Sequence, residues 1–134
     1  MLKLIIALVL VSHGIGHSMG LLQVFKIATV SPQWKGDSWL LTGSAGSTVS
    51  QVVAVSLWAL AIVGFAALAA MVVGWLPEAW WLPLAVGASA ASLAGLFLFP
   101  VAFPLFSTIG AFAANVAVLV AALWFHWVPS DLGA

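Results

Sequence analysis

Two histidines, His13 and His17, lie four residues apart in the run His13-Gly14-Ile15-Gly16-His17, inside an otherwise apolar stretch of the chain. On a helix, residues at i and i+4 share a face, so both imidazole rings point to the same side. Imidazole changes its protonation near neutral pH and is a common metal ligand. An ionisable group within an apolar, membrane-length stretch indicates a functional site. The histidine pair is therefore the first candidate site.

The histidine pair has three interpretations. In the first, both rings bind one metal ion, or one ring is the axial ligand of a haem. A haem with two histidine ligands would need two chains, because both rings of one chain reach the same side of the haem. A usable zinc site takes three or four ligands, yet the chain has no cysteine, and its acids, Asp37, Glu78 and Asp131, are predicted outside the membrane spans. In the second, the rings bond across helices as structural bridges. In the third, they contact a small ligand or handle protons.

Other chemistries find little support in the sequence. The chain lacks the Gly-x-Ser-x-Gly pattern of a serine nucleophile and has no paired carboxylates or phosphate-binding glycine loop. We therefore favour a protein that is not an enzyme. With three Lys and Arg against three Asp and Glu, the chain has no basic patch that would indicate a nucleic-acid partner.

The composition defines the elements that must hold these residues. Of 134 residues, 65% are hydrophobic and 4% are charged, whereas a soluble domain has about 25% charged residues. A membrane-crossing helix needs about 20 apolar residues, and four stretches qualify: 2–25, 47–73, 80–99 and 104–127. Helices satisfy their own backbone hydrogen bonds in lipid. The sequence predicts an all-α integral membrane bundle of four transmembrane helices, with residues 1–134 as one domain and the lipid bilayer as its surroundings.

The tryptophans mark the ends of these spans. Seven of the eight lie at or near a predicted end, as in the aromatic belt at the membrane surface: Trp34, Trp39, Trp75, Trp80, Trp81, Trp124 and Trp127. We interpret these seven as interfacial anchors. Trp58 lies deep in the second span, where it either packs in the core or lines an internal pocket.

The first span presents a row of small residues. Ser12, Gly16 and Gly20 repeat every four residues, which is a small-xxx-small pattern for close helix packing. The pattern predicts that a neighbouring helix lies along this row, with the histidines on its flank.

Span centres predict which polar residues share a depth. His13, Ser89, Ser92 and Asn115 fall near the middle of their spans, with His17 about 6 Å away toward the first loop. A buried amide is costly unless paired, so Asn115 is expected to bond across the bundle and to orient the histidines. The candidate ligand contacts are His13, His17, Asn115, Ser92 and Trp58.

The motif His13-Gly14-x-x-His17-x-x-Gly20, with Phe25 and Ala28 after it, resembles the first span of an uncharacterised family of small four-helix bacterial membrane proteins. The likeness continues through Leu57-Trp58-x-Leu60-Ala61, Phe65, Trp80-Trp81, Ser92 and the stretch from Thr108 to Asn115. The resemblance implies a protein of the bacterial cytoplasmic membrane and gives weight to His13, His17 and Asn115, without supplying an activity. The family has an acidic turn before the fourth span, whereas residues 99–104 here contain no acid.

Taken together, these features predict a small integral membrane protein whose midplane histidine site binds a small ligand, metal ion or cofactor. The alternative is an accessory or scaffold subunit in which the histidines only bridge helices. Its partners would be other membrane proteins or a second copy of the chain.

Overall fold

The structure is a computed structural model that describes residues 1–133. All regular elements in this part of the chain are helical, as the sequence predicts. Four helical stretches are long and apolar enough to cross a membrane: Leu2–Val24, made of α1 (Leu2–Gly16) and α2 (Ser18–Val24); α4 (Ser47–Val72); Glu78–Leu98, made of η1 (Glu78–Trp80) and α5 (Trp81–Leu98); and Leu105–Trp124, made of α6 (Leu105–Leu119) and the π-helical turn η2 (Val120–Trp124). Their ends differ from the expected spans by no more than three residues.

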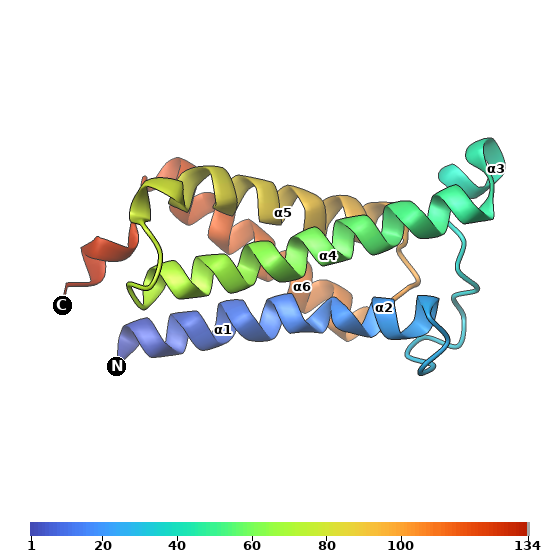
Figure 1. Ribbon diagram of the computed structural model, residues 1–134, viewed down its shortest axis with the longest axis horizontal. Helices are drawn as coiled ribbons and strands as arrows, with labels where there is room; N and C mark the ends of the chain where they lie inside the picture. The colour runs from blue at the N-terminus through green and yellow to red at the C-terminus, as the bar shows by residue number, and fades with distance from the viewer. Residues whose placement is uncertain (134) are drawn as a thin grey trace.

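Helix α4 lies at the centre of the arrangement and packs along both α1 and α5 (Figure 1). Helix α6 packs against α5 but meets α1 over only a short stretch. The N-terminus of α1 and the C-terminal turn η3 (Pro129–Leu132) lie at one end of the bundle, and the long first loop with the short helix α3 (Leu41–Ala45) lies at the other. The sparse contact between α1 and α6 leaves space on that side of the bundle.

The face of the first span that packs on α4 follows steps of three or four residues. Glycine is required where large side chains of α4 cross this face. A Cβ atom at Gly14 would lie 3.1 Å from Phe65 Cβ, and one at Gly20 would lie 2.7 Å from two ring carbons of Trp58. The buried residues of this face are Ala7, Leu10, Gly14, His17 and Gly20.

The predicted row of Ser12, Gly16 and Gly20 is therefore wrong as a packing face. Ser12 is exposed, and no atom of a neighbouring helix lies within 4 Å of a Cβ built at Gly16. Only Gly20 belongs to both rows. The aromatic side chains of α4 determine which glycines must face it, and the sequence of the first span alone does not contain that information.

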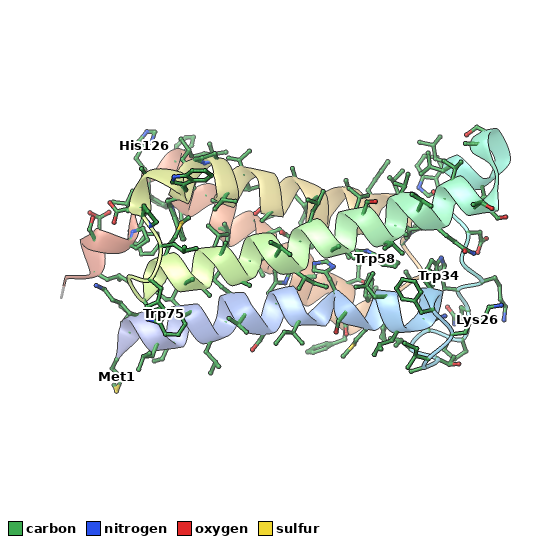
Figure 2. The ribbon with its side chains drawn as sticks, in the orientation of Figure 1. Met1, Lys26, Trp34, Trp58, Trp75 and His126 are labelled. Carbon is green, nitrogen blue, oxygen red and sulfur yellow. The ribbon has the colours of Figure 1, made fainter. Side chains whose placement is uncertain are left out.

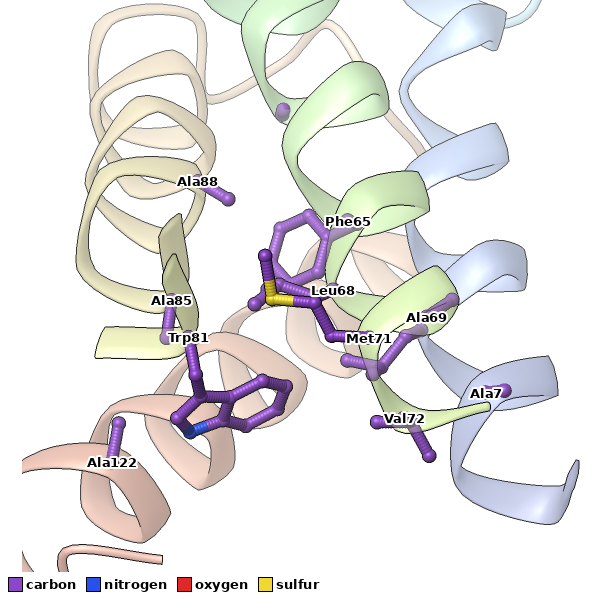
Figure 3. Packing of buried hydrophobic residues seen from close by; sticks show 12 residues of the cluster. Ala7, Phe65, Leu68, Ala69, Met71, Val72, Trp81, Ala85, Ala88 and Ala122 are labelled. Carbon is purple, nitrogen blue, oxygen red and sulfur yellow. The ribbon is translucent and has the colours of Figure 1, made fainter. Parts of the chain in front are cut away.

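Two buried clusters hold the bundle together. One surrounds Phe65, Leu68, Met71 and Trp81 at the end near the termini (Figure 3). The other surrounds Trp58 near the first loop, where its ring packs edge-on against Trp34, Phe99 and Phe103. Figure 2 shows Trp34 and Trp58 together at the end opposite Met1.

Two of the seven expected interfacial tryptophans are instead buried in these clusters. Trp34 and Trp81 are each 3% exposed. Trp34 reaches its cluster because the first loop folds back over the bundle, and its Nε1 donates to the Asp37 carbonyl oxygen (2.8 Å). Trp81 begins α5 but turns inward onto Trp127, at 5.0 Å between ring centroids. A position at the end of a span therefore does not establish that a side chain faces the interface.

Gln23 secures the first loop. Its Nε2 donates to the carbonyl oxygens of Ser31 (2.6 Å) and Trp34 (3.0 Å), and its Oε1 accepts from the backbone N–H groups of Val30 (3.0 Å) and Ser31 (2.7 Å). One side chain thus satisfies four backbone groups in a segment without regular structure. These bonds keep Trp34 over the Trp58 cluster.

Candidate functional site

A hydrogen-bonded chain of side chains joins three of the four spans. Ser92 Oγ of α5 lies 2.8 Å from His17 Nε2, and Asn115 Nδ2 of α6 donates to Ser92 Oγ at 2.7 Å. Asn115 Nδ2 also donates to the Ala111 carbonyl oxygen at 2.8 Å. Ser92 and Asn115 are completely buried, and His17 is 3% exposed.

The histidine in this chain is His17, whereas the span centres predict His13. Ser92 lies beyond the middle of α5, and His17 lies beyond the middle of the first span, both toward the first loop. The two offsets match, so these residues meet at one depth. Ser89, which was expected in the same layer, is buried, and its hydroxyl has no hydrogen-bond partner.

The bonds of Asn115 define the orientation of its own amide group. A carbonyl oxygen only accepts, so the Asn115 atom facing Ala111 must be the amide nitrogen. The second amide proton goes to Ser92 Oγ. The Ser92 hydroxyl has two lone pairs as well as its proton, so it either donates to His17 Nε2 or accepts from a protonated Nε2, according to the His17 tautomer. His17 Nδ1 and Asn115 Oδ1 have no hydrogen-bond partner.

His13 lies beside this chain without joining it. Its ring packs edge-on against Phe65 (4.3 Å between centroids) and against His17 (5.2 Å). The Asn115 side chain lies near enough to His13 for a weak hydrogen-bonding interaction, but no contact of His13 Nε2 has the distance and angle of a formed hydrogen bond. A buried polar atom without a partner is rare and calls for an explanation.

Two cavities meet at His13. The larger, which we call the apolar cavity, has a volume of about 480 Å³ and lies between α1 and the end of the fourth span; its walls include Ile5, Val9, His13, Phe65, Trp81, Ala117, Phe125 and Trp127. The smaller, which we call the histidine cavity, has a volume of about 240 Å³ and is lined by residues that include Ser12, His13, Gly16, His17, Ser107 and Gly110. Both lie where α1 and α6 are poorly packed against each other.

The apolar cavity opens toward the outside of the bundle, because Ile5, Val9 and Phe125 in its walls are more than half exposed. The π-helical turn η2 lies at one end of this cavity. A π-helical turn adds a residue to the helical repeat and often occurs at functional sites. Here Ala121 belongs to the turn, and Phe125 follows it directly, and both contribute to the cavity wall.

The residues present do not complete a metal site. Among residues 1–133, no group of three His, Cys, Asp or Glu side chains comes together. Of the two histidines, His17 has Nε2 bonded to Ser92. The donors that remain, one nitrogen on each ring, fall short of the three or four that zinc takes. For a haem, His13 is the histidine whose Nε2 is not already engaged in a hydrogen bond, so it would be the single axial ligand.

The predicted site residues are thus only partly brought together. His17, Ser92 and Asn115 form one chain, and His13 lies next to it. Trp58 packs in its aromatic cluster and lines neither cavity at His13. The sequence reasoning did not single out Trp81 or Phe125 as cavity residues. No sequence signal separates Trp81 from an ordinary interfacial tryptophan.

Four helices long and apolar enough to cross a membrane, together with the low content of charged residues, indicate a multi-pass membrane protein. Comparisons of the chain with protein families, with curated proteins and with solved structures find no match. Its function must therefore be argued from the site itself.

Proposed function

We propose that this protein binds a small membrane-soluble molecule, which enters from the bilayer between α1 and α6 and contacts His13. The observation that carries the proposal is the position of His13 between two cavities, with Nε2 unpartnered. Cavities of about 300–1,000 Å³ with mostly apolar walls and few polar groups are typical of ligand sites. The resemblance in the first span adds the proposal that the protein acts in the cytoplasmic membrane of a bacterium.

The two histidines have different roles in this proposal. His17 is a positioning residue, because Ser92 and Asn115 hold its ring. His13 is the ligand contact, because it lines both cavities and its Nε2 makes no formed hydrogen bond. A hydrogen bond formed there would satisfy an atom that has no partner within the protein.

A second function is favoured by the His17–Ser92–Asn115 chain. Polar bonds of this type hold membrane helices together, at about 0.6 to 2 kcal/mol each. If the histidines served only this purpose, the protein would be an accessory or scaffold subunit, with its lipid-facing surfaces free for partner membrane proteins. His13, which makes no such bond, distinguishes the two functions.

Photolabelling in lipid nanodiscs tests the proposal, with a long-chain alcohol carrying a diazirine as the probe. The labelled positions are mapped by mass spectrometry. We expect labelling to concentrate on the wall of the apolar cavity, and Ala117→Phe to reduce it severalfold by filling that cavity. The matched control is Ala113→Phe, on the same helix at an exposed position outside both cavities.

His13→Phe provides the second arm, since it keeps an aromatic ring against Phe65 and removes Nε2. Loss of one hydrogen bond should weaken binding about 3- to 10-fold, while His126→Phe, at an exposed residue, should leave it unchanged. Labelling spread evenly over the lipid-facing side chains, with no effect of either cavity variant, would refute the binding function in favour of the scaffold function.

A further inference from the structure

Trp81 carries a second unpartnered polar atom at the apolar cavity. The residue begins α5 and is 3% exposed, and its Nε1 atom has no hydrogen-bond partner. Figure 3 shows the ring turned into the bundle near Ala122 and Met71. An indole N–H only donates, and a buried tryptophan usually finds an acceptor for it.

Trp81 and His13 lie in the walls of the same cavity. Along α1 the cavity extends from Ile5 to His13, a rise of about 12 Å for eight residues. Trp81 and its neighbour Trp127 lie toward the end of the bundle that holds the termini, whereas His13 lies near the middle of its span. The cavity is therefore elongated, with one unpartnered polar atom toward each end.

The remaining walls exclude charged ligands. None of the residues that line the apolar cavity is Asp, Glu, Lys or Arg. A charge placed there would lose its hydration without gaining an opposite charge, which is strongly unfavourable. An uncharged oxygen, in contrast, would lose little and would satisfy a buried donor.

We propose that the apolar cavity binds an uncharged, elongated molecule with a hydrogen-bonding oxygen at each end, one accepting from Trp81 Nε1–H and the other bonded to His13 Nε2. Both nitrogens are buried and unpartnered in side chains that line the cavity, so each would gain a hydrogen bond if its side chain turned the nitrogen toward a ligand. A hydroxyl or a carbonyl oxygen can accept from Trp81 Nε1–H. A hydroxyl can bond to His13 Nε2 in either tautomer, whereas a carbonyl needs the tautomer with the proton on Nε2. A hydrocarbon body fits the wall between them. This inference rests on the proposed function and names the ligand class for that site.

Competition against the photoreactive alcohol tests the ligand class with the full chain in nanodiscs. The competitors are α,ω-alkanediols of graded length, the monohydric alcohols of the same lengths, and the corresponding alkanes. We expect the best diol to displace the probe at concentrations about 3- to 10-fold below its matched alcohol, because it makes one additional hydrogen bond. The alkane should be the weakest competitor.

Trp81→Phe assigns the additional bond, since it keeps an aromatic ring and removes the N–H. In this variant the diol and the alcohol should compete equally. Trp80→Phe is the matched control, because the adjacent Trp80 is 63% exposed and lies outside the cavity wall. The advantage of the diol should remain in that control.

The outcomes separate this inference from the function on which it rests. If the probe labels the cavity but diol, alcohol and alkane of equal length compete equally, the cavity binds apolar molecules and the ligand class is wrong. The ligand class is also wrong if the diol still competes at lower concentrations than the matched alcohol in the Trp81→Phe variant. If the probe does not concentrate in the cavity, the proposed function itself fails. The comparison of competitors on the unmodified protein gives an answer even if Trp81→Phe does not fold.

Discussion

Ser89 and Ser92 form a natural pair for testing the hydrogen-bonded chain. Both are completely buried on α5 and lie one helical turn apart. Ser92 bonds to His17 and Asn115, whereas the Ser89 hydroxyl has no partner. The same change, serine to alanine, therefore removes two hydrogen bonds at one position and none at the other.

Ser92→Ala should lower the free energy of unfolding by about 1 to 3 kcal/mol. This range follows from two interhelical bonds of about 0.6 to 1.7 kcal/mol each in a membrane protein. Ser89→Ala should leave stability unchanged or raise it slightly, because it removes a buried hydroxyl that gains nothing from its surroundings. The difference between the two variants reports the hydrogen bonds with little contribution from the lost volume, which is the same in both.

The measurement is reversible unfolding in mixed micelles by titration with a denaturing detergent, followed by helical circular dichroism. A His17→Leu and Asn115→Leu double-mutant cycle then tests whether the two residues are coupled through Ser92. Equal stabilities for Ser89→Ala and Ser92→Ala would refute the reasoning. It would mean that the chain of contacts contributes no net stability.

Two further predictions concern packing and the first loop. Gly20→Ala should destabilise the protein, because its Cβ would lie 2.7 Å from the buried Trp58 ring, whereas Gly16→Ala, with open space around it, should be neutral or slightly stabilising. The same unfolding titration checks both variants. Equal effects on stability would contradict the observed packing face. Gln23→Ala should accelerate hydrogen exchange of the Val30 and Ser31 amides by about tenfold, since both donate to the Gln23 Oε1 atom. Exchange in α4 should change little. Mass spectrometry measures the exchange, and unchanged protection in the loop would show that other contacts hold it.

Local sequence patterns were sufficient for the outline of the fold. Uninterrupted apolar stretches are predicted as helices, because lipid offers no partner to a backbone N–H or carbonyl group. The prolines agree with this outline: the stretch from Pro100 to Pro104 separates α5 from α6, and Pro83 lies in the first turn of α5, where its missing N–H does no harm. The π-helical turn at Val120–Trp124 was not foreseen.

The site was harder to predict, because it depends on how each helix is rotated and how far it is shifted along its axis. The sequence indicated that His17, Ser92 and Asn115 would matter, since buried polar groups need partners. It assigned the central layer to His13, because it treated each span as centred at the same depth. It also took Trp34 and Trp81 as interfacial residues, because their positions in the chain match that role, yet both are buried.

The sequence by itself predicted an all-helical chain with four segments long and apolar enough to cross a membrane, and with two histidines in the first of them. Composition and apolar length are sufficient for that conclusion, because the bilayer imposes the same requirement on any segment that spans it. Tertiary structure alone decided that Gly14 and Gly20 face α4, that His17 meets Ser92, and that His13 and Trp81 share a cavity. Those outcomes depend on the shapes of side chains on two or more helices at once. Close packing makes the rotation and shift of one helix a property of its neighbours as much as of its own sequence.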